Sequence, residues 1–242
     1  MQNAAEITAR REVAGAHRLA VDHGLNEGVW NHISLCSPDE PENILMSPGH
    51  MHWGQVTASN LALMAPDGSL LAGARPPIRA GWIIHHPVHK ARTDAKCVIH
   101  VHAPYTTAMS IRQDMRLETR SSQQAAAFHN DVAYYEVYDG NLSDESEGEH
   151  MAEVLGDKRI LMMRNHGAMI VGATVGQAYL DTYQLERACM YQLLAVGGGG
   201  DMSLIPEDVA ADIGRQAREG FHQNHFDGMM AYITEKEPDV TT

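Results

Sequence analysis

The sequence of 242 residues has little that would indicate a membrane or secreted protein. No apolar run approaches the ~20 residues that a membrane-spanning helix requires. The N-terminal segment MQNAAEITARREV contains no apolar signal core. The three cysteines, at positions 36, 97 and 189, form no CxxC pair, which favours reduced thiols. We therefore expect a cytoplasmic protein without a membrane partner.

Basic residues are also scarce, because 18 Lys and Arg stand against 31 Asp and Glu, for a formal net charge of −13. A protein that binds nucleic acid without sequence preference needs a basic face, so we expect no nucleic-acid partner. The hydrophobic fraction of 44% is enough for a real core, and the length fits one sizeable domain. We place that domain at residues 1–200 and a C-terminal helix with a polar tail at residues 201–242.

Helices alternate with short strands along the chain, as is typical of an α/β or α+β domain. The expected helices cover about 4–23, 82–92, 104–112, 175–196 and 206–221, and a further helix ends near 155. The expected strands lie within 30–46 and at 97–101, 132–138, 160–163 and 168–172. The segment VTASNLALM, at 56–64, is expected to form a short helix that leads into a strand. Pro87 weakens the second helix, because a proline inside a helix removes a hydrogen bond.

Histidine is the residue type in excess, with 15 in the chain and seven between residues 50 and 102. His100 and His102 end an apolar strand, where residues i and i+2 point to the same face about 6–7 Å apart. This spacing lets both imidazoles reach one metal ion, which then needs a third ligand. His166, in the RNHG turn between two β-type runs, is the candidate. The pattern alone also fits one buried and one exposed histidine without a metal.

Two further histidines lie at helical spacing just before this strand. His85 and His89 are i and i+4, so they share one helix face. They are candidate catalytic proton donors, because histidine titrates near neutral pH. Packing against the neighbouring strand is the alternative. His50, in the glycine loop SPGHMHWGQ, is a candidate for substrate contact.

Taken together, these motifs resemble the class II aldolase/adducin family. GWIIHHPVHKARTDAKCVIHVHAP and the later RNHGAMIVG carry the resemblance, which covers about residues 5–196. AGWIIHHPVH and GQVTASNL are similar to the adducin-head branch. The resemblance implies a three-layer α/β/α fold with a central, mainly antiparallel sheet, and a cyclic homotetramer. It also implies a divalent metal, usually zinc with manganese or iron as alternatives, held by His100, His102 and His166.

The sequence departs from the aldolase pattern at the catalytic glutamate. The family's acid/base glutamate precedes the tryptophan that opens the helix, whereas Gly81 precedes Trp82 here. The serine pair that binds phosphate in the sugar-phosphate aldolases is replaced by Arg79–Ala80. Arginine pairs well with carboxylate, which indicates a carboxylate-bearing substrate. The candidate substrate-binding residues are Asn31, which matches a family asparagine, Gly49, His50 and Arg79.

These features predict a metal-dependent carbon–carbon lyase that acts on a small carbonyl or carboxylate substrate. The resemblance implies cleavage of the decarboxylase or aldolase type through a metal-bound enolate. A decarboxylase tolerates the missing glutamate best, since it needs only protonation of the resulting carbanion, by His85 or His89. Two alternatives stay open, namely a non-haem Fe(II) oxygenase of the same fold and a non-catalytic, adducin-like interaction domain.

Overall fold

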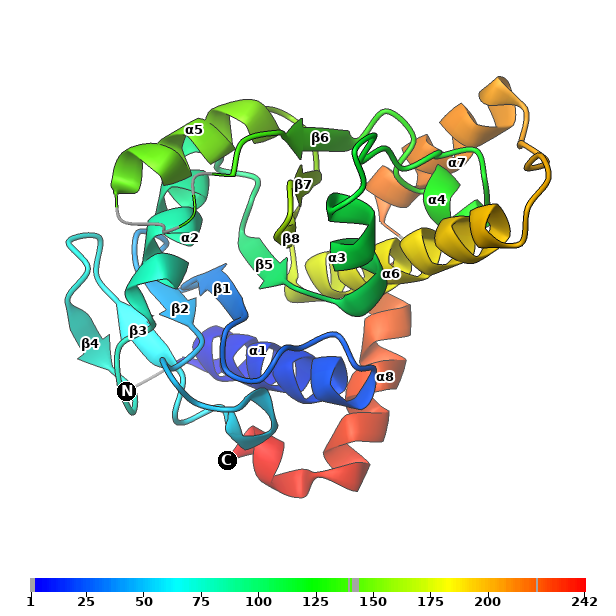
Figure 1. Cartoon of the computed structure of the whole chain (residues 1–242). Coiled ribbons are helices and arrows are strands. Elements are labelled where there is room, and N and C mark those ends of the chain that lie inside the picture. Colours follow the sequence, from blue (N-terminus) through cyan, green and yellow to red (C-terminus); the bar gives the residue numbers. More distant parts are fainter. Residues whose placement is uncertain (1–2, 139, 141–143, 221) are drawn as a thin grey trace.

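The protein is described from a computed structural model, which describes residues 3–138, 140, 144–220 and 222–242 (Figure 1). Within these residues eight strands form one sheet in the order β4-β3-β2-β1-β5-β8-β7-β6. The strands are β1 (His32–Cys36), β2 (Ile44–Met46), β3 (Ala62–Met64), β4 (Leu70–Ala72), β5 (Cys97–Val101), β6 (Val132–Tyr135), β7 (Ile160–Met163) and β8 (Gly167–Gly172). Neighbouring strands are antiparallel except β6 and β7, which confirms the mainly antiparallel sheet.

Helices cover both faces of this sheet (Figure 1). One face carries α1 (Ala4–Asp22), α6 (Val175–Gly197) and α8 (His222–Lys236), and the other carries α2 (Arg79–Ala91) and α5 (Glu145–Leu155). The shorter or peripheral helices are α3 (Pro104–Ser110), α4 (Gln123–Ala126), α7 (Glu207–Glu219), η1 (Trp53–Gln55) and η2 (Pro238–Thr241). One apolar core lies on each side of the sheet, which confirms the predicted three-layer fold.

Strand β1 shows how the sequence sorts residues between the two cores. Side chains alternate between the two faces of a strand. Ile33 and Leu35 belong to the core on the α1 side, whereas Ser34 faces α2 and contacts two of its histidines. A row of polar side chains is therefore buried between β1 and α2.

Two expected elements differ in the structure. No helix forms at residues 56–60, because the Asn60 side chain satisfies the loop backbone: it accepts from the Thr57 N–H at 3.0 Å and donates to the Gln55 carbonyl oxygen at 3.0 Å. The segment expected as a polar tail is instead helix α8. Its Phe226 and Ile233, seven residues apart, bury their side chains against α1 and α6.

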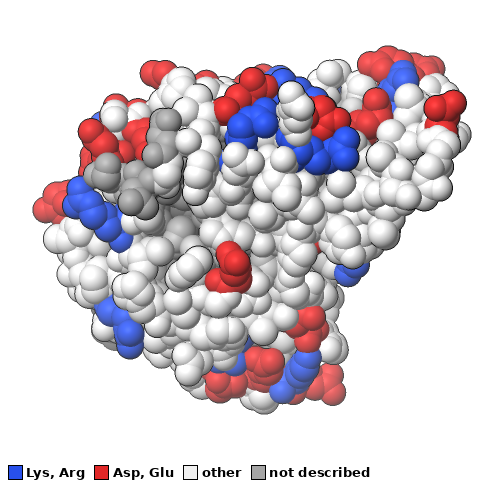
Figure 2. Space-filling view, viewed as in Figure 1, with Lys and Arg blue, Asp and Glu red and all other residues white. Residues whose placement is uncertain are grey.

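The length and hydropathy of the helices and the distribution of surface charge are two further features of the fold. Within the part of the chain described, no helix combines the length and the apolar character that crossing a membrane requires. On the face shown in Figure 2, acidic and basic side chains are interspersed along the edge and leave the middle largely uncharged.

Helices α2 and α5 approach closely at the proline that weakened the helix prediction. Pro87 has no N–H, so the carbonyl oxygen of Ile83, four residues earlier, loses its partner within the helix. Gly148 of α5 lies directly over this carbonyl: a Cβ at Gly148 would overlap the Ile83 oxygen and lie 3.0 Å from the Pro87 Cγ. The absence of a side chain at Gly148 therefore lets α5 approach α2 closely at this turn.

We expect Gly148→Ala to destabilise the protein by about 1–3 kcal/mol, because the added methyl group forces α5 away from α2. Gly228→Ala is the matched control, since Gly228 lies within α8 and a Cβ there meets nothing within 4 Å. This control should stabilise the protein by up to about 1 kcal/mol through helix propensity. Urea unfolding of both variants checks the prediction, and a stabilised Gly148→Ala would contradict it.

His17 is a buried histidine on the α1 side of the sheet, remote from the exposed surface. Its Nδ1 lies 2.7 Å from the Val13 carbonyl oxygen and its Nε2 lies 2.6 Å from Ser47 Oγ. Burial lowers the pKa of His17 from 6.5 to about 4. The imidazole is therefore neutral in the folded protein at neutral pH.

This pKa predicts acid destabilisation. Between pH 6.5 and about 4, the unfolded chain binds a proton at His17 that the folded protein does not bind, so stability falls as pH falls. We expect His17 to contribute roughly 3 kcal/mol to this loss by pH 4. Urea unfolding at several pH values should give a shallower pH dependence for His17→Gln than for the wild type. Equal slopes would show that His17 does not cause the effect.

Candidate metal centre

The hairpin turn between β7 and β8 places His166 over the end of β5. Asn165 takes a left-handed conformation with φ of 57°, which asparagine adopts more readily than most residues. Gly167 follows, and a Cβ at this position would overlap the carbonyl oxygen of Val101 in β5. The sequence Asn-His-Gly thus allows the turn to form and lets β8 approach β5.

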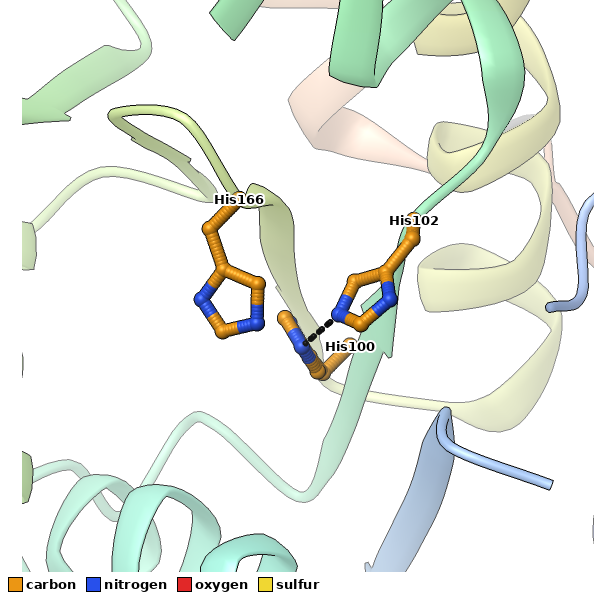
Figure 3. A group of neighbouring side chains, drawn as sticks. All are labelled: His100, His102 and His166. Atoms are coloured by element: carbon orange, nitrogen blue, oxygen red, sulfur yellow. Dashed lines mark hydrogen bonds between the residues drawn. The ribbon is translucent and has the colours of Figure 1, made fainter. Parts of the chain in front are cut away.

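Three imidazoles converge at this point (Figure 3). His100 lies in β5, His102 follows that strand, and His166 comes from the turn. One ring nitrogen from each residue lies within 4.8 Å of the other two. The Nε2 atoms of His100 and His102 are 3.0 Å apart. His100 is buried and the other two are half-buried, so the group borders the surface.

Hydrogen bonds fix which ring nitrogen of His100 and of His102 is protonated. His100 Nδ1 donates to the Ala168 carbonyl oxygen at 3.0 Å, and His102 Nδ1 donates to Glu27 Oε2 at 2.6 Å. Because a carbonyl and a carboxylate oxygen only accept, both Nδ1 atoms carry the proton when the rings are neutral. The two Nε2 lone pairs then face each other at 3.0 Å. A cation between them removes this repulsion, so the residues fit a metal ion.

Burial keeps His100 and His166 in the form that binds metals. It lowers the pKa of His166 to about 4 and holds the pKa of His100 well below its ordinary value, and the neighbouring imidazoles add to both shifts. Neutral imidazole is the ligating form of histidine. Three neutral nitrogen ligands leave a divalent ion with its full charge and an open coordination position, as in catalytic zinc sites.

Glu27 is a site residue that the sequence prediction missed. It lies in the loop between α1 and β1, 75 residues before its partner His102. Asn31 supports this loop, because its side-chain oxygen accepts from the Glu27 N–H and its carbonyl oxygen accepts from Trp53 Nε1 at 3.1 Å. A carboxylate on the outer nitrogen of a ligating histidine orients the ring and raises its basicity.

The predicted substrate-binding residues lie in different surroundings. Asn31 is buried and holds the Glu27 loop, and Gly49 packs tightly on the Pro76 carbonyl oxygen, to which its N–H donates at 3.0 Å. His50 is exposed with φ of 57°, and Arg79 is exposed at the first turn of α2. Their roles in substrate binding stay predictions.

A small cleft borders His166 on the side of β6 and α5. Its lining includes His166, Arg164 and Tyr138. The ring centroids of Tyr138 and His166 are 6.4 Å apart. The Arg164 guanidinium donates to the carbonyl oxygens of Arg112, at 3.4 Å, and Gln113, at 3.5 Å.

The predicted catalytic histidines share a helix face but do not join the cluster. His85 and His89 are buried, and both contact Ser34 Oγ, at 2.6 and 2.7 Å. Burial lowers the pKa of His89 to about 4 and that of His85 well below its ordinary value. They do not line the cleft beside His166, and their role as proton donors stays a prediction.

His32 is the second residue that sequence reasoning missed. Its ring stacks on His100 with centroids 5.5 Å apart and meets His85 edge-on at the same distance. A Cβ on Gly81 would lie 2.8 Å from His32 Cδ2. The space beside Gly81, where the aldolase glutamate would begin, is therefore filled by His32. The sequence predicts strands within 30–46, but nothing in this segment indicates the contact of His32 with Gly81.

Comparison with known proteins gives the same fold and the same family. The profile of the Class II Aldolase and Adducin N-terminal domain matches residues 11–193. An adducin-related protein of Schizosaccharomyces pombe is 32% identical over 241 residues, which cover 95% of this chain and 72% of that protein. The solved structure of an aldolase II superfamily protein from Pseudomonas syringae is 30% identical with a TM-score of 0.91, over 100% of this chain and 98% of that one.

A solved enzyme is also similar. The L-fuculose 1-phosphate aldolase of Glaciozyma antarctica is 25% identical with a TM-score of 0.84, over 98% of this chain and 95% of that one. The protein therefore belongs to the class II aldolase and adducin family. This finding confirms the resemblance on which the predicted fold depended.

We expect Glu27→Gln to weaken metal affinity about 10–100-fold, because the neutral amide no longer supports His102 as the carboxylate does. Glu136→Gln is the control, since Glu136 forms an exposed ion pair with Arg116 that does not touch the cluster. Competition with a chromophoric chelator for Zn²⁺ measures both affinities. Equal affinities in the two variants would contradict a supporting role for Glu27.

Proposed function

We propose that the protein is a divalent-metal-dependent lyase that cleaves a carbon–carbon bond next to a carbonyl group of a small substrate. The observation that carries the proposal is the convergence of the His100 and His102 Nε2 lone pairs at 3.0 Å, with His166 beside them. A bound divalent ion supplies Lewis-acid polarisation of a carbonyl oxygen. We propose zinc as the ion, with manganese or iron as alternatives, because zinc suits three imidazole ligands with an open position.

Residues of the protein would position the metal ligands and bind the substrate. Glu27 holds the His102 ring in place through its 2.6 Å hydrogen bond. Arg164 also lines the cleft next to His166. Its contacts with the Arg112 and Gln113 carbonyl oxygens are long, at 3.4 and 3.5 Å, so the guanidinium would exchange them for a substrate carboxylate. A carboxylate-bearing substrate, such as a 2-oxo acid or a hydroxy acid, fits this pair of features.

The filled space at Gly81 favours decarboxylation over aldol cleavage. An acid/base side chain at position 81 would collide with His32, whose Cδ2 lies 2.8 Å from the position of a Cβ. Aldol cleavage needs a base that removes a hydroxyl proton, whereas decarboxylation needs only a proton delivered to the carbanion. We therefore propose a decarboxylase-type lyase that is cytoplasmic and forms the homotetramer that the family resemblance implies.

One other function is favoured by a specific observation. The adducin-related relative is 32% identical over nearly the whole chain, so a non-catalytic interaction domain is the second candidate. The two candidates differ in their need for a metal. An interaction domain has no use for three neutral imidazoles around one point, whereas a lyase depends on them.

The experiment combines elemental analysis of the purified protein with a substrate screen. We expect about one divalent metal per chain and release of CO₂ from a 2-oxo acid or hydroxy acid that stops on addition of a chelator. His166→Ala, which removes one half-buried ligand, should lose both metal and turnover, and Glu136→Gln should keep both.

Other outcomes of this experiment separate the candidates. A protein that holds no metal after loading with Zn²⁺, Mn²⁺ or Fe²⁺ would overturn the lyase and support the interaction domain. Oxygen uptake with iron bound would instead identify the oxygenase, although iron oxygenases of this type use two histidines and a carboxylate. Turnover that persists in the chelator would contradict a metal-dependent reaction.

A further inference from the structure

A hydrogen-bonded chain of buried polar side chains leads from the end of α2 toward the metal cluster. His89 Nδ1 lies 2.8 Å from the carbonyl oxygen of Ala95. His89 Nε2 lies 2.7 Å from Ser34 Oγ, and the same hydroxyl lies 2.6 Å from His85 Nδ1. The exposed fractions of Ser34 and His85 are 0%, and that of His89 is 8%. Water therefore does not compete for these contacts.

The direction of every hydrogen bond follows from the first one. The Ala95 carbonyl can only accept, so His89 Nδ1 carries a proton. Burial lowers the pKa of His89 to about 4, so the ring is neutral at pH 7 and its Nε2 is a lone pair. Ser34 must then donate its hydroxyl proton to His89 Nε2 and accept from His85 Nδ1. His85 is also neutral, so its Nε2 can only accept.

The series of hydrogen bonds ends at the His85 Nε2 acceptor, and the His85 ring lies next to His32. Nε2 of His85 and both ring nitrogens of His32 are buried and have no hydrogen-bond partner within the described residues. The two rings meet edge-on with centroids 5.5 Å apart. A buried polar atom without a partner is costly, and the His85 Nε2 lone pair and a His32 N–H are complementary groups on two neighbouring rings. The His32 ring also stacks on His100, with centroids 5.5 Å apart.

We propose that Ser34, His85 and His89 are positioning residues, which act through His32 on the metal ligand His100. Ser34 and His89 hold His85 as the Nδ1–H tautomer, and His85 then accepts from His32 and fixes its ring against His100. The inference rests on the proposed metal centre and deepens it, because it names the support of its most buried ligand. Gly81 is part of the arrangement, since a Cβ there would lie 3.0 Å from His32 Cγ.

Ring-nitrogen NMR on the full-length protein tests the tautomers directly. In uniformly ¹⁵N-labelled protein, the shifts of His85 and His89 should show a protonated Nδ1 and an unprotonated Nε2, with and without Zn²⁺. Loss of the His85 and His89 signals in His85→Gln and His89→Gln assigns them. A protonated Nε2 on His85 would overturn the proposal, because His85 could then not accept from His32.

Metal affinity tests the consequence. Ser34→Ala removes the central hydroxyl and should weaken Zn²⁺ binding about tenfold, as outer-shell substitutions do. Ser47→Ala is the matched control, because Ser47 is also a buried serine bonded to a histidine, His17, but on the α1 side of the sheet. We expect a similar fall in thermal stability in both variants and weaker Zn²⁺ binding in Ser34→Ala alone. Ser34→Thr, which keeps the hydroxyl, should restore most of the affinity.

The failure of this inference differs from the failure of the proposed function. If the wild type binds Zn²⁺ and Ser34→Ala binds it equally well, the positioning role is wrong and the metal centre stands. If the wild type binds no divalent metal, the proposed function is wrong whatever the tautomers are. If Ser34→Ala does not fold, the NMR result on the wild type still decides between the two tautomers of His85.

Discussion

Two nitrogen lone pairs that face each other at 3.0 Å are the constraint on which the site depends. The Ala168 carbonyl and the Glu27 carboxylate take the protons of the outer nitrogens, so the inner nitrogens of His100 and His102 have nothing left to donate. Such an arrangement is unfavourable without a cation and favourable with one. Strand β8, the loop after α1 and the end of β5 must all be in place to create it.

The face of the sheet under α2 contains a second group of buried polar side chains. Polar side chains from β1 and α2 are buried there in an otherwise apolar layer, and they contact one another rather than water. Burial of polar groups is tolerated because the chain from Ala95 to His85 satisfies each donor in turn. Close approaches at Gly81 and Gly148 leave the space that the rings and the helices need.

Membership of the class II aldolase and adducin family accounts for the fold and the histidine cluster. The difference from the aldolase pattern lies at position 81, where a ring from strand β1 occupies the space of a side chain. The side chain that the aldolases place before the tryptophan of α2 is absent here, and the His32 ring lies against the glycine in its place. The three-histidine cluster is thus present, while the group beside position 81 is a packed, neutral ring.

Local patterns in the sequence determined most of the elements and three of the site residues. The strand period placed His100 and His102 on one face, the RNHG turn presented His166, and the i, i+4 spacing put His85 and His89 on one side of α2. Each depends on residues close together in the chain, where backbone geometry sets direction. The tertiary structure alone decided that Glu27 supports His102 from 75 residues away, that His32 fills the space at Gly81, and that α8 packs where a polar tail was expected. These contacts join distant segments, and local periodicity carries no information about which segments meet.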